Sequence, residues 1–420
     1  MRSVVNSGHQ IFYAASRFSQ NQNALSINIE GTHMHAEIEV SIVMPCLNEA
    51  DTLERCISKA QKALRDNGIS GEIVIADNGS TDGSLRIAER MGVRLVPIER
   101  KGYGNALMGG IEEALGRFII MGDADDSYDF LEIPRFVEML RQGYELVMGC
   151  RLPSGGGTVI KDAMPFLHRW IGNPLFSFMV RIMYHAPIHD VYCGLRGFTR
   201  DLYDRLSLQC TGMEFATEMV IKSSLIEARI GEVSITLHPD GRRAHKPHLK
   251  TFIDGWRTLR FFMLYSPRWL FLLPGLFLII LGAIGYALAF FGYTFYGIIL
   301  DTHTLLVSSL VILIGYQGVI FAIMTKIFTI REGLLPEDPR FIEIFKVFTL
   351  ENGLIVSALA FIAGVLFIGV VAIEWWRSGF GPLDYSKSMR LVITGVILCA
   401  LGFQSCMGSF FASILGMRRR

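Results

Sequence analysis

The hydrophobic pattern divides the chain into two parts. Up to about residue 268, short apolar runs alternate with charged segments. The remaining part holds four apolar segments, at about 269–293, 305–325, 353–373 and 391–416. About 20 uncharged residues in a helix are enough to cross the ~30 Å hydrocarbon core of a membrane. We therefore predict a folded N-terminal domain followed by a transmembrane domain of four helices over residues 269–420.

Residues 39–151 alternate between apolar runs rich in Val and Ile and helix-like segments. The apolar runs are EVSIVMPCL, GEIVIAD, RLVPIE, RFIIMGD and ELVMGCR. Such strands, alternating with helices of about ten to fifteen residues, are typical of a parallel sheet covered on both faces. The pattern predicts an α/β domain with a mostly parallel sheet over residues 39–248, preceded by a flexible tail at residues 1–38.

Three of these strands end in charged residues, namely Asp77, Asp123 and Arg151. Ligands of parallel α/β sheets bind beyond the carboxyl ends of the strands. Any one of these residues could instead cap a turn or a helix. Together, the three indicate a binding site at one edge of the sheet.

Four carboxylates follow the fourth predicted strand within seven positions: Asp123, Asp125, Asp126 and Asp129. Like charges this close repel one another unless a cation lies among them. An Asp-x-Asp pair can face one hard cation, and Mg²⁺ or Mn²⁺ binds through one or two carboxylates plus substrate phosphates. We therefore predict a divalent metal at Asp123 and Asp125 that carries a diphosphate.

Composition supports the membrane prediction and excludes one class of partner. The chain has 420 residues, of which 51% are hydrophobic, and its mean hydropathy is +0.37. The net charge of +1 gives no broad basic field, so nucleic acid is not an expected partner. The seven cysteines form no CxxC pair and are typical of a reducing compartment.

Several motifs recur in a recognisable order. They are SIVMPCLNEADTL, IADNGSTDGS, GYGNALMGGIEEA, GDADDSYDF, LVMGCR and DVYCGLRGFTRD. Over about residues 39–265 the chain resembles the family 2 glycosyltransferases of the GT-A fold, and among them the polyprenyl-phosphate sugar transferases similar to dolichyl-phosphate mannose or glucose synthases. The resemblance implies these nucleotide-sugar-binding residues, with Asp77 facing the base: Pro45, Glu49, Asp77, Asp123, Ala124, Asp125, Arg242 and Lys246.

The chain departs from the family pattern directly after the Asp-x-Asp pair. Asp126 and Ser127 stand where many relatives have an apolar residue and Gln, which leaves a third metal contact unassigned. By the same resemblance, Arg151 and Arg169 are expected to contact the acceptor phosphate. Asp123, Asp125 and Arg151 are then the expected catalytic residues.

Two segments, at residues 161–185 and 249–269, mix aromatic side chains with Arg, Lys and His. This composition is typical of helices that lie in a membrane interface, and it also suits amphipathic helices packed on the sheet. We predict an interfacial amphipathic helix over residues 249–268.

An even number of membrane spans places the N-terminal domain and the C-terminus on the same side. The loop between the second and third spans carries Lys326, Arg331, Arg340 and Lys346. The first outer loop, GYTFYGIILDTH, has no Lys or Arg, while the second has Arg377, Lys387 and Arg390. Because cytoplasmic loops carry the excess of Lys and Arg, we predict a multi-pass cell-membrane (inner-membrane) protein with a cytoplasmic catalytic domain and C-terminus.

The expected function is metal-dependent, inverting transfer of a hexose from a UDP- or GDP-sugar to polyprenyl phosphate, either undecaprenyl or dolichyl. One alternative is a membrane glycosyltransferase with a glycolipid or polysaccharide acceptor, for which Glu214 or Asp126 could be the base. Another is a non-catalytic membrane protein that binds nucleotide-sugar. The membrane is an expected partner in each case, and a homo-oligomer is compatible with all of them.

Overall fold

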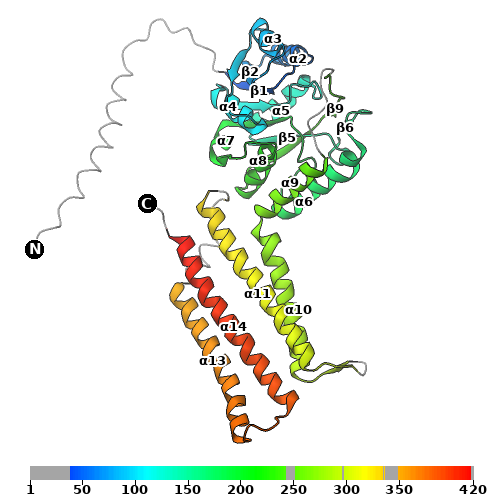
Figure 1. Cartoon of the computed structure of the whole chain (residues 1–420). Coiled ribbons are helices and arrows are strands. Elements are labelled where there is room, and N and C mark those ends of the chain that lie inside the picture. The colour runs from blue at the N-terminus through cyan, green and yellow to red at the C-terminus, as the bar shows by residue number, and fades with distance from the viewer. Residues whose placement is uncertain (1–37, 243–250, 296–297, 334, 336–348, 418–420) are drawn as a thin grey trace, which may run out of the picture.

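The computed structural model describes residues 38–242, 251–295, 298–333, 335 and 349–417. Figure 1 shows an α/β domain joined to long helices that extend away from it. The predicted architecture, a mostly parallel α/β domain followed by an α-helical domain of four long apolar helices, is confirmed for the part of the chain that the structure describes.

The α/β domain is built on a seven-stranded sheet of order β3-β2-β1-β4-β7-β5-β8. In that order the strands are Arg94–Pro97, Gly71–Asp77, Val40–Cys46, Phe118–Met121, Arg196–Thr199, Leu146–Cys150 and Ile230–Ser234. All five strands predicted from the apolar runs are present. Only β7 is antiparallel to its neighbours, β4 and β5.

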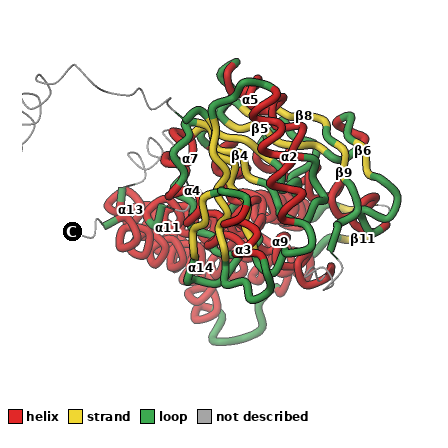
Figure 2. Tube along the Cα trace, turned by 90° about the horizontal axis from the view of Figure 1, so that it is seen from above, coloured by secondary structure: helices red, strands yellow, loops and turns green. Residues whose placement is uncertain are grey.

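Helices cover both faces of this sheet, as Figure 2 shows from above. One face packs against α2 (Leu53–Asp66), α3 (Ser84–Arg90) and α5 (Ile133–Arg141). The other packs against α4, α6, α7, α8 and α9, which are Tyr103–Glu113, Asn173–Tyr184, Arg200–Leu206, Glu214–Leu225 and Thr251–Leu264. Because both faces are buried, the central strands are apolar almost throughout, and only one residue of β1, Pro45, is not fully buried.

Helix α2 shows how the sequence pattern sets this packing. Its buried residues are Leu53, Cys56, Ile57, Ala60, Ala63 and Leu64. These positions recur every three or four residues and so form one apolar stripe on a helix of 3.6 residues per turn. The stripe packs on the sheet, and the polar face of α2 is left toward solvent.

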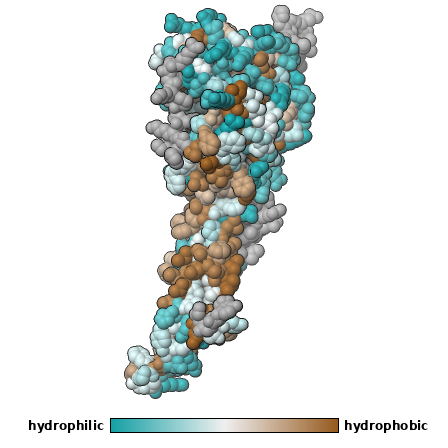
Figure 3. Space-filling model, turned by 90° about the vertical axis from the view of Figure 1, so that its right-hand side faces the viewer, coloured by the Kyte–Doolittle hydropathy of each residue, from teal (hydrophilic) through white to brown (hydrophobic). Residues whose placement is uncertain are grey.

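Among the described residues, four helices are long and apolar enough to cross a membrane. They are Arg268–Phe290 (η4 with α10), Thr302–Arg331 (α11), Leu350–Arg377 (α13) and Tyr385–Gly416 (α14). The last three contain the predicted segments whole, while the first ends at Phe290 rather than Tyr293. Helices α10 and α11 meet through glycines, since a Cβ on Gly275 would lie 2.7 Å from the carbonyl oxygen of Gly315. Figure 3 shows apolar surface along this helical part that continues onto the base of the α/β domain.

Helices α6 and α9 form the junction between the two parts. The Phe176 and Phe262 rings meet edge to face with centroids 5.8 Å apart. The Tyr184 hydroxyl donates to the carbonyl oxygen of Phe262 at 2.7 Å. Helix α9 lies within the predicted interfacial segment and is separated from the first membrane helix by Tyr265–Pro267.

Candidate active site

The charged cluster lies where β1, β2 and β4 end, at the carboxyl edge of the sheet. Glu49 follows β1, Asp77 ends β2, and Asp123 and Asp125 follow β4. Parallel pairing of β1 with both β2 and β4 brings these three ends together.

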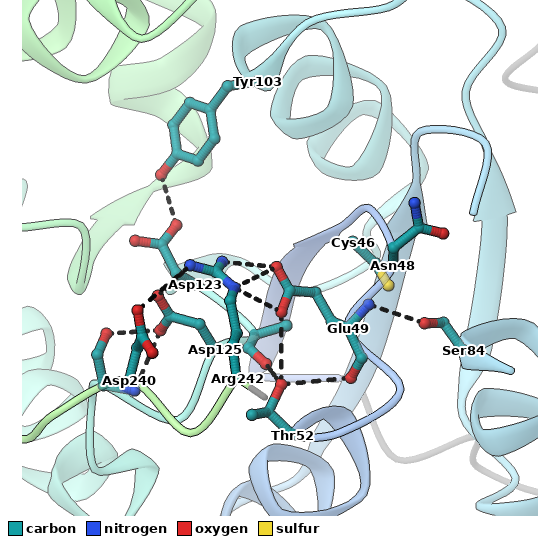
Figure 4. A network of polar contacts seen from close by, with 12 residues as sticks. Cys46, Asn48, Glu49, Thr52, Ser84, Tyr103, Asp123, Asp125, Asp240 and Arg242 are labelled. Atoms are coloured by element: carbon teal, nitrogen blue, oxygen red, sulfur yellow. Dashed lines mark hydrogen bonds and ion pairs between the residues drawn. The ribbon is translucent and has the colours of Figure 1, made fainter. Parts of the chain in front are cut away.

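Arg242 is the cation at the centre of the cluster, as Figure 4 shows. Its Nε and Nη2 donate to the Glu49 carboxylate at 2.9 and 2.6 Å. Its Nη1 lies 3.2 Å from Oδ2 of Asp125. The segment that carries Arg242 is held on the Asp-x-Asp loop because the Gly241 N–H donates to the Asp125 carbonyl oxygen at 2.9 Å.

The electrostatics of Arg242 follow from these contacts. Burial by itself lowers the pKa of a guanidinium, but the Glu49 hydrogen bonds and the charge of Asp125 outweigh it, so the pKa of Arg242 rises. The Arg242 cation is therefore stabilised by Glu49 and by Asp125, and Asp125 is one of the four carboxylates that the sequence indicated would need a positive partner.

Asp123 is held differently. Its Oδ1 accepts a hydrogen bond from the Tyr103 hydroxyl at 2.9 Å (Figure 4). Burial, followed by repulsion from Asp125, raises the pKa of Asp123 to about 6. A second cation close to Asp123 would favour its ionised form.

The other two carboxylates of the cluster pair with α2 and with the following turn. Lys59 Nζ donates to Oδ1 of Asp126 at 2.9 Å, and Arg55 lies 3.4 Å from Oδ2 of the same residue. Asp129 Oδ1 accepts from the Leu131 N–H at 3.2 Å and lies 3.8 Å from Lys59. Protein cations thus neutralise part of the cluster, in addition to any metal.

Three further residues expected at the nucleotide-sugar site lie on this edge. The Asp77 carboxylate accepts from the backbone N–H groups of Gly79 and Ser80, at 2.9 and 3.2 Å, and so shapes the turn after β2. Pro45 is near the end of β1. Ala124 is buried, and its carbonyl oxygen accepts from the Thr52 hydroxyl at 2.7 Å.

Arg151 is buried beyond β5 in a bidentate ion pair with Asp190. Its Nε and Nη2 donate to the two Asp190 oxygens at 2.7 and 2.9 Å. Its Nη1 lies 3.4 Å from the Tyr128 hydroxyl. Burial lowers the pKa of a guanidinium, but the Asp190 charge outweighs this effect and holds the pKa of Arg151 well above its usual value.

Arg169 lies outside this network, in the π-helical turn η3 (His168–Gly172) that leads into α6. Its guanidinium carbon is 5.2 Å from the centroid of the Trp170 ring, and its buried Nε has no hydrogen-bond partner among the described residues. Lys246, also expected to bind the donor, lies outside the described residues.

The donor set suits a divalent metal bound jointly by protein and diphosphate. No group of three or more His, Cys, Asp or Glu side chains is arranged to hold a metal in the part of the chain that the structure describes. Asp123 and Asp125 nevertheless offer hard oxygen ligands on one loop, and Mg²⁺ commonly takes one or two carboxylates and completes its shell with water and phosphate. The residues therefore fit Mg²⁺ or Mn²⁺ arriving with a nucleotide-sugar.

Sequence reasoning assigned no role to Tyr103, Asp190 or Tyr128, although each contacts a predicted site residue. Tyr103 and Asp190 lie in the motifs GYGNALMGGIEEA and DVYCGLRGFTRD. Their partners are 20 and 39 residues away along the chain, so spacing alone did not connect them.

The described chain combines a mostly parallel sheet, charged side chains at the carboxyl edge of that sheet, and four long apolar helices. This is the arrangement of a membrane-bound protein of the GT-A type. The family described as glycosyl transferase family 2 matches residues 41–207, and the glycosyltransferase family 2 C-terminal transmembrane region matches residues 323–416. A low-salt glycan biosynthesis hexosyltransferase, Agl6 of Haloferax volcanii, is 34% identical over 380 residues, which cover 90% of this chain and 89% of that protein. The chain belongs to glycosyltransferase family 2 and is a glycosyltransferase.

Other similar proteins match mainly the α/β domain. A dolichyl-phosphate hexose transferase of Haloferax volcanii is 28% identical over 218 residues, which cover 52% of this chain and 89% of that protein. A crystal structure of glucosyl-3-phosphoglycerate synthase from Mycobacterium tuberculosis, with Mn²⁺, UDP and glucosyl-3-phosphoglycerate, is 22% identical. The match covers 55% of this chain and 78% of that chain, with a TM-score of 0.41.

Proposed function

We propose that this glycosyltransferase moves a hexose from a UDP- or GDP-sugar to polyprenyl phosphate with inversion at the anomeric carbon. The observation that carries the proposal is the Glu49–Arg242–Asp125 cluster at the carboxyl edge of a domain whose base joins a membrane helix. The name of the similar dolichyl-phosphate hexose transferase agrees with such an acceptor.

On the donor side, Asp123 and Asp125 would hold Mg²⁺ or Mn²⁺, which acts on the leaving diphosphate as a Lewis acid. Arg242 would then exchange part of its contact with Asp125 for the diphosphate oxygens. Pro45, Glu49, Asp77 and Ala124 lie along the same edge and would line the donor pocket. Charge that develops on the diphosphate is stabilised by groups already in place before the reaction.

On the acceptor side, the protein needs both an apolar surface and a phosphate contact. Together with the two residues before it, the η3–α6 segment exposes these large apolar side chains: Phe166, Leu167, Trp170, Ile171, Leu175, Phe178 and Ile182. They recur at helical spacing next to Arg169, and α6 packs on α9, which leads into the first membrane helix. This arrangement supports a lipid chain held at the membrane surface with its phosphate directed toward Arg169.

Chemistry with a phosphate acceptor needs little from a general base. A phosphate monoester is already anionic, so the main tasks are to position two substrates and to stabilise the leaving nucleotide. Asp126, a candidate base for a carbohydrate acceptor, is engaged by Lys59 and Arg55. That contact makes Asp126 a poor base and leaves Glu214 as the candidate base for a glycolipid or polysaccharide acceptor.

We further propose that the catalytic domain and the C-terminus face the cytoplasm. Four spans return the chain to its starting side, and the loop that follows α11 carries more Lys and Arg than the loop that precedes it. Reporter fusions after Met417 and in the turn at residues 378–384 should lie on opposite sides of the membrane.

A donor and acceptor screen with the purified protein tests this function. Labelled UDP- and GDP-hexoses are each incubated with polyprenyl phosphate, a glycolipid and a soluble glycan, in the presence of Mg²⁺ or Mn²⁺. Label should appear in a polyprenyl-phosphate product. Transfer to the glycolipid or the glycan alone would support the alternative acceptor, and nucleotide-sugar binding without transfer would support a non-catalytic protein.

A further inference from the structure

A buried ion pair lies on α8, on the sheet face opposite α2. Glu218 is fully buried and Lys222 is 4% exposed. Lys222 Nζ lies 2.9 Å from Oε1 of Glu218. Burying two charges costs desolvation energy that their attraction often fails to repay, so such a pair is weak evidence for added stability. The role of the pair is therefore better judged from the backbone groups that its two side chains bind.

Glu218 and Lys222 fix the chain segment between α7 and α8. The Glu218 Oε2 atom accepts from the backbone N–H groups of Gln209 and Cys210, at 3.0 and 2.8 Å. Lys222 Nζ donates to the carbonyl oxygen of Ser207 at 2.9 Å. Three backbone groups within four residues thus depend on one ion pair.

This segment in turn supports the first turn of α4. The Asn105 N–H donates to the Thr211 carbonyl oxygen at 3.2 Å. A Cβ on Gly102 would lie 2.5 Å from the same oxygen, and one on Gly104 would meet the backbone of Cys210 and Thr211. The contact is backbone against backbone, so a shift of the segment must move the start of α4.

Tyr103 lies between those two glycines and donates to Oδ1 of Asp123 at 2.9 Å. On the other side of Glu218, the Tyr265 hydroxyl donates to Oε1 at 3.3 Å. Tyr265 lies between α9 and the membrane helix that begins at Arg268. One carboxylate thus contacts both the membrane junction and the segment that supports Tyr103.

We infer that Glu218 is a positioning residue that sets the place of Tyr103, and through it Asp123, and that couples this place to the membrane junction at Tyr265. The inference rests on the proposed function only in taking Asp123 to be part of the metal–nucleotide site. Contiguous hydrogen-bonded and packed groups of this kind can carry energetic coupling between sites, provided that the coupling is measured.

The test measures binding of UDP and GDP, each with Mn²⁺, by calorimetry on the full-length protein in lipid nanodiscs. The variants are Glu218→Gln, which keeps the shape but removes the charge, and Tyr265→Phe, which removes only a hydroxyl. Glu227→Gln, an exposed residue just beyond α8, controls for loss of charge. Because a charge-assisted hydrogen bond is lost, we expect affinity to fall by about tenfold in Glu218→Gln and about threefold in Tyr265→Phe.

A double-mutant cycle with Tyr103→Phe separates positioning from a merely structural role. If Glu218 acts through Tyr103, Glu218→Gln should weaken nucleotide binding no further once the Tyr103 hydroxyl is absent. Fully additive losses would contradict the inference, as would unchanged affinity in Tyr265→Phe, a variant that keeps its ring packing. Wild-type protein that binds neither nucleotide would instead overturn the proposed function, and this inference with it.

Discussion

Single residues of the acidic cluster have clearly different partners. Asp125 contacts Arg242, Asp126 contacts Lys59, and Asp123 contacts only a neutral hydroxyl among the described hydrogen bonds and ion pairs. The sequence predicted that the four carboxylates need positive charge, and part of that charge comes from the protein. Of the four carboxylates, Asp123 is therefore the one whose ionised form an added cation would stabilise most.

Replacing Asp125 by Asn should nearly abolish turnover while leaving the fold intact. The substitution removes a charged ligand from a loop and leaves Arg242 its stronger contact with Glu49. Loss of one preorganised electrostatic contact typically costs about a hundredfold or more in kcat. Steady-state kinetics with saturating Mg²⁺ or Mn²⁺ and a thermal melt measure the two effects. Asp129→Asn is the matched control. Near wild-type turnover in Asp125→Asn would show that Asp125 is not a metal ligand.

Replacing Arg169 by Ala should weaken binding of the acceptor and leave binding of the nucleotide-sugar unchanged. A charge-assisted contact to phosphate is worth about 1.5–3 kcal/mol, so acceptor kcat/KM should fall about tenfold to a hundredfold. Arg169→Lys should recover only part of the loss, because an ammonium lacks the bidentate fork of a guanidinium. Steady-state kinetics at varied polyprenyl phosphate concentration measure the acceptor kcat/KM, and a separate binding experiment measures nucleotide affinity. The control is Arg181→Ala, at an exposed position. Full recovery by Lys would indicate a side chain that merely reaches the membrane surface.

At the scale of elements, the sequence predicts the strands that end in the site better than the strands that complete the sheet. The five apolar runs correspond to β1–β5 because buried parallel strands are nearly continuous in apolar residues. Strand β7, Arg196–Thr199, has four residues, one of them Gly, and β8 is interrupted by polar side chains. Their place in the sheet is set by pairing with β4 and β5, which no local pattern expresses.

The same limit applies to the site. Its acidic strand ends are visible in the sequence because they interrupt apolar runs. The Arg242–Glu49 pair joins residues 193 positions apart, and only the family resemblance suggested a role for both. The Arg151–Asp190 and Glu218–Tyr265 pairs depend on how whole elements pack, so the sequence predicted the location of the site but not its supporting contacts.

The first turn of α4 offers a stability test of the element packing. In Gly104→Ala the new Cβ would lie 2.8 Å from the carbonyl carbon of Thr211 and 3.0 Å from the oxygen of Gly212, which are backbone atoms. Overpacking of this kind costs about 1–3 kcal/mol. In Gly109→Ala, on the same helix, the new atom meets only the end of the Ile98 side chain, and better helix propensity offsets the strain. Denaturant or thermal unfolding should therefore give Gly104→Ala a clearly lower free energy of unfolding than Gly109→Ala. Equal free energies of unfolding would contradict this packing.

Glu39 ties the start of β1 to α5 and β4, and it should make stability depend on pH. Hydrogen bonds from Arg141, which outweigh burial, together with Arg117 lower the pKa of Glu39 from 4.5 to about 2. A carboxyl whose pKa is lower in the folded state adds stability above its unfolded pKa. That contribution is lost as the pH falls from about 4.5 toward 2.

The variant Glu39→Gln should accordingly melt at a lower temperature than wild type at neutral pH, and the difference should shrink over that acidic window. Thermal melts across the pH range measure the difference, with the exposed Glu99→Gln as a charge control. A difference that stays constant into acid would show that the two arginine contacts do not depend on the Glu39 charge.

At the scale of the whole molecule, the proposed function requires a water-soluble donor and a membrane-bound acceptor to meet at one place. The carboxyl edge of the sheet carries the proposed donor residues. Helix α6, which exposes apolar side chains, packs on α9, and α9 leads into the first membrane helix. Figures 1 and 3 show this base of the α/β domain next to the apolar helices. The architecture thus suits an acceptor with a charged headgroup and a long apolar chain.

Sugar transfer in lipid nanodiscs tests this account most directly. Wild-type protein and Asp125→Asn receive labelled nucleotide-sugar, Mg²⁺ or Mn²⁺, and either polyprenyl phosphate or the matching polyprenol without phosphate. The account predicts a labelled lipid product only from wild-type protein with polyprenyl phosphate. Equal transfer to polyprenol, or undiminished transfer by Asp125→Asn, would contradict it.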